Sequence, residues 1–237
     1  MTARMALLFR IVRRVAVLVV LGWALWWLLL DPKSPLPPEW HPATPLDVTA
    51  DQTWLTGMKL RRAVSSDEAC FAALATGAVF ERLTPLDAGP QCGIAPRLLL
   101  QSVDGVPLSP VETTCMTALR VAMWQRHTLR PAAARLGTQI TRLRHQGSYN
   151  CRSIRGDPTR MSTHATARAI DIRGVRLADG RAFELISGWD DTGEEGAFWR
   201  EARDGACRWF ATVLGPDFNA AHADHFHLQA VGWGLCR

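Results

Sequence analysis

Six cysteines constrain this chain more than any other feature, because each must be paired, bound to a metal or kept reduced. They are widely spaced, at Cys70, Cys92, Cys115, Cys151, Cys207 and Cys236. No two have a C-x-x-C spacing, so a zinc knuckle or a thioredoxin-type redox site has little support. An even number of separated cysteines predicts three disulfides in an oxidising compartment, with fifteen pairings open. Buried free thiols are the alternative.

The N-terminal segment is first basic and then apolar. Sixteen uninterrupted apolar residues run from Val15 to Leu30, after a head that contains four arginines. This run is shorter than the roughly 20 residues of a full span, but apolar residues upstream extend it. A cleaved signal peptide is the alternative, although no small-residue cleavage pattern follows Leu30. We expect residues 1–30 to form an uncleaved single-pass transmembrane helix in the inner membrane, with the rest of the chain in the periplasm.

Charge is concentrated at the same end. The whole chain of 237 residues has a formal charge of +5, and residues 1–33 hold five basic residues against one acid. The remaining 22 basic and 21 acidic residues nearly cancel. Phosphate binding requires clustered excess positive charge, so this balance argues against a nucleic-acid partner. The length and a hydrophobic content of 48% favour one sizeable domain with an appendage.

Proline content marks the boundary of the domain. Six prolines in residues 31–45 exclude a helix or a central strand and predict a stiff extended tether. We expect the folded domain to span residues 46–237. Helices are predicted over residues 49–64, 65–77 and 109–137. Pro131 is expected to kink the last of them.

The pattern changes after Gly137. Strand-length runs of β-branched and apolar residues occupy residues 138–145, 167–175, 181–187 and 225–231. The sequence RLADG separates the middle two and predicts a hairpin. A helix is expected over residues 194–215, facing the sheet through Phe198, Cys207, Phe210 and Leu214. Helices followed by a small antiparallel sheet with one further helix predict an α+β domain.

Three histidines and an aspartate stand within seven residues in the sequence HADHFHL, residues 222–228. If this segment is a strand, its side chains alternate, so His225 and His227 share one face while Phe226 and Leu228 point into the core. Two neighbouring imidazoles on a rigid strand suit a metal. A polar surface strand is the alternative, because an isolated H-x-H occurs there by chance. His222 precedes the strand and is either an orienting hydrogen-bond partner or a solvated loop residue.

A second constellation lies in the sequence STHATARAIDI, residues 162–172. It places His164 seven positions before Asp171, whose carboxylate sits inside an apolar strand and needs a partner. Two histidines and an aspartate form the ligand set of a catalytic zinc site, which leaves a fourth position to water. Pairing of Asp171 with Arg168 or Arg173 is the alternative.

Several motifs in order resemble a known family. They are GSYNCR, STHATARAIDI, LADG, ACRWFATVLGP and HADHFHLQ. Together, over roughly residues 60–237, they resemble the bacterial extensin-like C-terminal domain family. The pattern S-x-H-x-x-x-x-A-x-D followed by H-x-H is also similar to the zinc peptidase superfamily of D-alanyl-D-alanine carboxypeptidases, dipeptidases, murein endopeptidases and the hedgehog fold.

The superfamily resemblance implies a role for each matching residue. His164, Asp171 and His227 match the three ligands of a zinc ion. Two candidates for the general base stay open, His225 and Asp224, because each falls at a position that one branch of the superfamily uses.

Arg152 resembles the arginine of a Gly-Tyr-Arg-Ser motif that would stabilise the scissile carbonyl oxygen. One departure is Ala167, where the superfamily usually has glycine.

The resemblance implies a zinc-dependent peptidase acting on peptidoglycan stem peptides or cross-links at the outer side of the cytoplasmic membrane. Its partners would be the peptidoglycan peptide and, through the N-terminal segment, the membrane. The alternative is a catalytically inactive envelope module that keeps the metal as a structural element and binds peptidoglycan or a partner protein. A disulfide-stabilised binding domain without metal is the third option.

Overall fold

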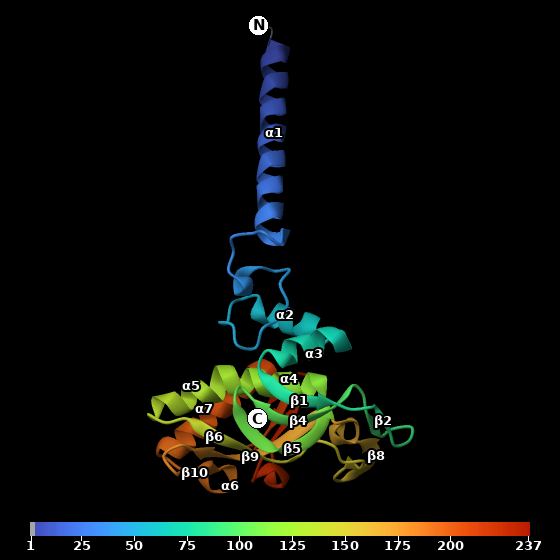
Figure 1. The fold of residues 1–237 in the computed structure, drawn as a ribbon, viewed down its shortest axis with the longest axis vertical. Helices are drawn as coiled ribbons and strands as arrows, with labels where there is room; N and C mark the ends of the chain where they lie inside the picture. Colours follow the sequence, from blue (N-terminus) through green and yellow to red (C-terminus); the bar gives the residue numbers. More distant parts are fainter. Residues whose placement is uncertain (1–2) are drawn as a thin grey trace. The chain divides into compact units, whose positions relative to one another are not determined.

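The computed structural model describes residues 3–237 and divides them into two compact units. The smaller unit comprises the chain up to Leu46 together with Asp51–Leu60, and the larger comprises Asp47–Ala50 and Arg61–Arg237. The larger unit is an α+β domain with antiparallel sheets and helices, as the sequence predicts (Figure 1).

The smaller unit begins with helix α1 (Ala3–Leu30), which includes the whole apolar run. Large apolar side chains of α1 such as Leu18 and Val19 are exposed. Within residues 3–237, no helix combines the length and the apolar character that crossing a membrane requires. The prediction of a transmembrane helix therefore has no support from this structure.

The proline-rich segment is more ordered than the extended tether predicted for residues 31–45. Pro38–Trp40 form a 3₁₀ turn. The buried Lys59 ammonium, on helix α2 (Thr56–Ala63), donates to the Pro38 carbonyl oxygen at 2.6 Å and to Thr44 Oγ1 at 2.7 Å. Prolines cannot donate backbone hydrogen bonds. The segment is ordered by turn hydrogen bonds of its other residues, such as Trp40 to Pro37 and Thr44 to His41, together with the Lys59 side chain.

A first sheet lies between helices in the larger unit and is absent from the sequence prediction. Its antiparallel order is β1-β4-β5. The elements of this half are α3 (Asp67–Ala75), β1 (Ala78–Arg82), β2 (Leu86–Asp87), β3 (Gly93–Ile94), β4 (Arg97–Val103), β5 (Val106–Thr114), α4 (Cys115–Trp124), a π-helical turn (Gln125–Leu129) and α5 (Arg130–Arg135). The expectation of helices first and strands afterwards is wrong, and the predicted helix over 109–137 begins at Cys115.

The second sheet holds two of the residues predicted to bind metal, Asp171 and His227. Its order is β10-β9-β12-β11-β13, and β6 also pairs with β9. The elements of this half of the chain are β6 (Ile140–Gly147), β7 (Ser153–Ile154), β8 (Asp157–Met161), β9 (Ala169–Leu177), β10 (Ala182–Glu184), α6 (Leu185–Gly188), α7 (Glu194–Trp209), β11 (Thr212–Leu214), β12 (Phe226–Gln229) and β13 (Leu235–Cys236), of which β7 and β8 pair separately. The β9–β10 hairpin is confirmed. The predicted helix over 194–215 ends at Trp209, so Leu214 lies in a strand.

Helices α4 and α7 supply the core behind this sheet. Trp124 and Trp199 are fully buried, and the Trp124 indole donates to the Ala202 carbonyl oxygen at 2.8 Å. Trp199 meets Phe226 edge to face with a centroid distance of 5.8 Å. Because Phe226 and Leu228 are anchored in the core, the alternate residues of β12 turn to the other face of the sheet.

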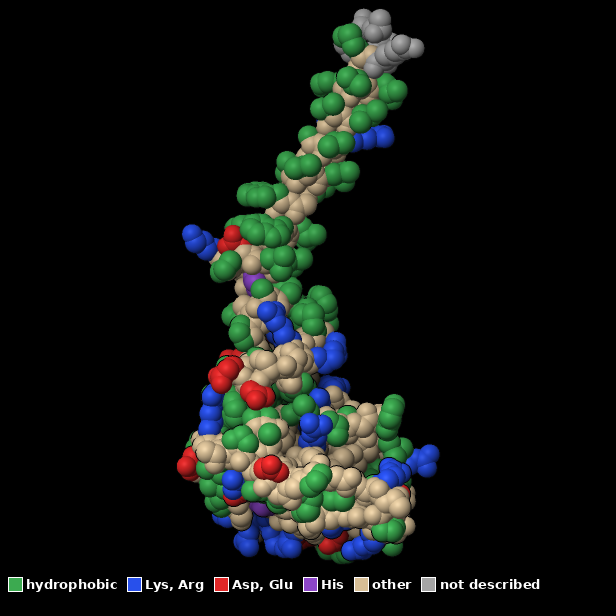
Figure 2. Space-filling model, turned by 90° about the vertical axis from the view of Figure 1, so that its right-hand side faces the viewer, with side chains coloured by type: hydrophobic (Ala, Val, Ile, Leu, Met, Phe, Trp, Pro, Cys, Tyr) green, Lys and Arg blue, Asp and Glu red, His purple; other side chains and the backbone are tan. Residues whose placement is uncertain are grey.

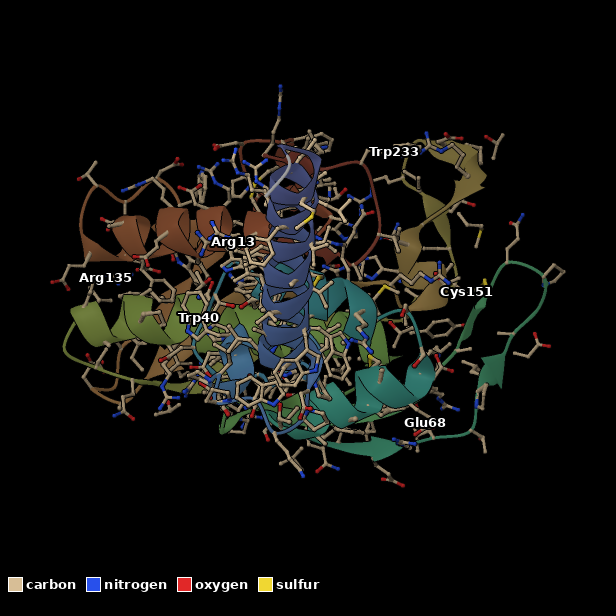
Figure 3. The ribbon with its side chains drawn as sticks, turned by 90° about the horizontal axis from the view of Figure 1, so that it is seen from above. Arg13, Trp40, Glu68, Arg135, Cys151 and Trp233 are labelled. Carbon is tan, nitrogen blue, oxygen red and sulfur yellow. A yellow bond between two sulfur atoms is a disulfide. The ribbon has the colours of Figure 1, made fainter. Side chains whose placement is uncertain are left out.

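Three disulfides form, as the cysteine count predicts. They join Cys70 to Cys115, Cys92 to Cys151, and Cys207 to Cys236, and no cysteine of the described chain is free. Figure 3 shows Cys151 at one edge of the larger unit, at the opposite end from Arg135.

We predict that replacing both Cys70 and Cys115 with alanine lowers the free energy of unfolding by about 4 kcal/mol. The two residues are 45 positions apart, and a cross-link of that length restricts the unfolded chain by roughly this amount. Chemical denaturation measures the loss. A reductant acting on the wild-type protein opens all three bonds and should cost more, and an unchanged midpoint in the double variant would contradict the expectation.

Candidate metal centre

His164 is presented by a short turn ahead of β9. The turn is a 3₁₀ helix (Thr163–Thr166) capped by the Ser162 hydroxyl, which accepts a hydrogen bond from the His164 amide. The His164 Nδ1 lies 2.6 Å from the Ser148 carbonyl oxygen, which can only accept, so Nδ1 carries the proton. His164 Nε2 is then the free ligand atom, and the side chain is 4% exposed.

Asp171 and His227 stand directly opposite each other on neighbouring strands. They are paired in the antiparallel register of β9 and β12. His227 Nδ1 lies 2.8 Å from Asp171 Oδ1, and their side chains are only 10% and 15% exposed. The expected alternation of β12 is confirmed, because Phe226 and Leu228 are buried on the other side.

The three predicted ligand residues converge on one point. His164 Nε2 lies 3.1 Å from Asp171 Oδ2 and 3.0 Å from His227 Nδ1. Ligands at about 2.0–2.1 Å in tetrahedral positions around zinc are about 3.3 Å apart, so this set fits zinc after a small expansion. In the described chain, His164, Asp171 and His227 each offer one ligand atom, and these atoms all lie within 4.8 Å of one another.

Electrostatics favour an ionised carboxylate at the centre. Burial raises the pKa of Asp171, but the close contacts with the His164 and His227 imidazoles outweigh burial and hold the pKa well below its ordinary value. Burial lowers the pKa of His227 in spite of its contact with Asp171, which favours the neutral imidazole. An anionic oxygen beside neutral imidazole nitrogens is what a divalent cation requires. The alternative partners Arg168 and Arg173 do not pair with Asp171 in residues 3–237.

His225 lies beside the three residues and is oriented by Asp224. Its Nδ1 is 2.8 Å from Asp224 Oδ1, while its Nε2 faces the centre at 3.6 Å from Asp171 Oδ1. Asp224 is 48% exposed, and its other oxygen accepts from the Gln146 amide at 2.7 Å. The hydrogen bond from His225 is the first cause of a lowered Asp224 pKa. The carboxylate therefore points to His225 Nδ1, and His225 Nε2 points to the centre.

His222 lies in the same cluster, and its role as an orienting hydrogen-bond partner stays a prediction. Its ring centroid lies 5.3 Å from that of His225 and 5.7 Å from that of His227. Its Nδ1 is 2.7 Å from Asn219 Oδ1. Burial and then the two neighbouring imidazoles lower the pKa of His222 to about 4, so it is neutral at neutral pH. In the sequence, the motif H-x-x-H-x-H is the feature that indicates that His222 is close to His225 and His227.

Arg152 lies on the chain just before β7, next to the His164 turn. Its carbonyl oxygen accepts from the Ser162 amide at 3.0 Å. Its exposed guanidinium donates to the Ser153 carbonyl oxygen at 3.2 Å. Among the described residues, none of its hydrogen bonds reaches a ligand residue, so a role at the scissile carbonyl stays a prediction.

The family model described as extensin-like protein C-terminus matches residues 68–237, which is most of the chain and includes every residue of the cluster. The chain belongs to this family. No curated protein and no solved structure matches the chain. The resemblance to the extensin-like family is thereby confirmed, and the relation to the zinc peptidase superfamily stays a prediction.

Buried hydroxyl groups support the ligand loop of the extensin-like domain. They converge on the carbonyl oxygen of Ala167, where the sequence departs from the expected glycine. The Thr117 hydroxyl lies 2.9 Å from this oxygen, and the Thr113 and Thr114 hydroxyls lie 3.2 Å from it. The Ser148 hydroxyl donates instead to the Ala169 carbonyl oxygen at 2.6 Å, at the start of β9. These hydrogen bonds hold the segment between His164 and Asp171 in place. No local sequence motif predicts them.

Ala167 has a left-handed backbone with φ of 49° and is fully buried. Such a conformation costs an alanine about 1–2 kcal/mol, whereas glycine loses roughly 0.5–1 kcal/mol more chain entropy on folding. We predict that Ala167→Gly leaves the free energy of unfolding unchanged or raises it by up to about 1 kcal/mol. Thermal and chemical unfolding measure it.

Ala165 supplies the matched control for that substitution. It is equally buried, two residues earlier, and its φ is not positive. Ala165→Gly has no left-handed strain to relieve and should lose about 0.5–1 kcal/mol. Equal losses at both positions would show that the left-handed backbone stores no strain.

Proposed function

We propose that this extensin-like domain is a zinc-dependent peptidase that hydrolyses an amide bond in peptidoglycan stem peptides or cross-links. The observation that carries the proposal is the convergence of His164, Asp171 and His227 beside an imidazole that Asp224 orients toward the same point. A purely structural metal site has no need of the Asp224–His225 pair. The choice of substrate rests on the superfamily resemblance and on export.

Export is proposed from the disulfides. All six cysteines are paired, and bonds of this kind persist outside the reducing cytoplasm. We therefore place the domain in the cell envelope. Alkylation of the protein in intact cells, with and without prior reduction, tests this: six thiols should become reactive only after reduction.

The proposed reaction uses the residues as they lie. Zinc held by the three ligands would activate a water molecule and polarise the substrate carbonyl. Because Asp224 accepts the Nδ1 proton of His225, Nε2 is left with its lone pair toward the centre. His225 then takes a proton from the attacking water and returns it to the leaving amine, while Asp224 stabilises the imidazolium formed in between.

The test combines metal analysis with product analysis. The full chain is purified, its zinc content is measured, and intact sacculi and soluble muropeptides are incubated with it before mass spectrometry. We expect one zinc per chain and new products that differ by one water. A chelator should abolish these products and added zinc should restore them.

The alternative proposal is a metal-stabilised envelope module without activity. The placement of the Arg152 guanidinium on the Ser153 carbonyl oxygen favours it, because no arginine then serves the scissile carbonyl. Bound zinc without hydrolysis of any muropeptide would support this alternative. If the protein folds normally without zinc, the remaining interpretation is a disulfide-stabilised binding domain without metal.

A further inference from the structure

Four arginines lie beside the metal centre on the same open face of the second sheet. We call Arg142, Arg144, Arg173 and Arg176 the arginine strip; the first two belong to β6 and the last two to β9. Leu143 and Val175, paired across the two strands, are buried in the core, so their neighbours in sequence turn outward. Figure 1 shows β6 and β9 side by side.

The strip is continuous with the centre. Asp171 and Arg173 are two residues apart on β9 and share a face. The pairing of β6 with β9 shifts register between Ile172 and Gly174, so Arg173 has no partner residue on β6 and the outward face continues at Arg176. At the other end of the same pairing, Gly147 of β6 stands opposite Asp171, and Gln146 holds Asp224. A strand rises about 3.4 Å per residue, so the strip extends from roughly 7 Å to roughly 17 Å from Asp171 along β9.

The strip carries more positive charge than the fold neutralises. Glu184 contacts both Arg144 and Arg173, and it is the one carboxylate that forms ion pairs with the strip in residues 3–237. Arg142 and Arg176 are exposed and directly opposite each other across the two strands. Like charges in that position destabilise a sheet. The pKa of Arg144 is lowered by burial and further by the charges of Arg173 and Arg176.

Like charges held together at a stability cost point to a ligand of opposite charge. Figure 2 faces the side of the molecule that carries β2 and β8, where further Lys and Arg side chains lie along the lower edge of the larger unit. We infer that the arginine strip binds the carboxylates of an acidic peptide and directs that peptide to the metal centre. The inference rests on the proposed peptidase function for the location of the scissile bond. An extended peptide would place its carboxylates about two to five residues from that bond.

The test measures binding without turnover. The full chain carrying His225→Ala is loaded with zinc and titrated into two fluorescein-labelled peptides, Ala-Glu-Ala-Glu-Ala-Ala-Ala and its Gln counterpart. At low salt we expect the Glu peptide to bind about tenfold more tightly, because two exposed charge pairs supply roughly that factor. The preference should fall at 0.5 M salt.

Variants assign the preference to the strip. Arg142→Gln with Arg176→Gln removes two exposed charges that have no ion pair among the described residues, and the preference should fall below about threefold. Arg61→Gln with Arg62→Gln removes two exposed charges from α2 and should leave it at about tenfold. Arg176→Glu changes the charge by the same two units and should also bring the preference below about threefold. Circular dichroism confirms that each variant is folded.

Two results would overturn the inference. The first is equal binding of the Glu and Gln peptides, or an unchanged preference after Arg142 and Arg176 are replaced. The second is displacement of the Glu peptide by polyphosphate at lower concentration than by the unlabelled peptide, which would assign the strip to phosphate polymers. Because binding is measured without hydrolysis, failure of the peptidase proposal would leave a measured preference for acidic peptides intact.

Discussion

Asp171→Asn is expected to abolish hydrolysis and to weaken zinc binding by about two to four orders of magnitude. The substitution keeps the shape of the side chain but removes the anionic carboxylate, whose Oδ1 lies 2.8 Å from His227 Nδ1 and whose Oδ2 lies 3.1 Å from His164 Nε2. Taking one partner from a buried charged set costs about 3–5 kcal/mol, and each 1.4 kcal/mol is a factor of ten. Competition with a chromophoric chelator measures the affinity.

Asp224→Asn is the matched control, because it removes a carboxylate from the same cluster without touching the ligand set. Asp224 is half exposed and bonds Gln146 and His225. The zinc affinity of the Asp224→Asn variant should stay within about tenfold of the wild-type value. If Asp171→Asn binds zinc as tightly as the wild-type chain does, the ligand assignment is wrong.

The convergence of His164, Asp171 and His227 is more predictable from the sequence than the fold that holds them. The three candidate ligands lie in two short motifs, and β9 and β12 have the period of strands. Their register, which sets Asp171 opposite His227, follows from buried Ile170, Ile172, Phe226 and Leu228 on the other face.

The first sheet was missed because β5 contains Pro107 and Pro110. Ser109 followed by a proline has the pattern of a helix start, and proline is normally excluded from a sheet interior. In the structure β5 is an edge strand, where a missing backbone donor is tolerated. The helix begins instead at Cys115, after the Thr114 hydroxyl caps it.

Residues that act through long-range contacts had no signal in the sequence. Ser148 orients His164 through its backbone carbonyl, and any residue type has that group. Thr117 reaches Ala167 across 50 positions of sequence. The arginine strip arises from the register between β6 and β9, which the composition of each strand does not reveal.

His225→Ala is expected to lower the hydrolysis rate by about 10²–10⁴ while leaving zinc affinity within roughly tenfold. The first value is the usual loss when a general base is removed, and the second follows because His225 is outside the set of ligand atoms that lie within 4.8 Å of one another. Measured together on one protein preparation, the two values separate a catalytic histidine from a residue that only supports the metal.

The same assay ranks the two candidates for the base. Asp224 contacts His225 Nδ1, while His225 Nε2 faces the centre. Asp224→Asn should therefore disturb only the orientation of the His225 ring and lower the hydrolysis rate by about 10–100-fold. A larger loss for Asp224→Asn than for His225→Ala would make Asp224 the base and require its carboxylate to leave Gln146. If both variants leave hydrolysis unchanged, a water activated without either side chain performs the reaction.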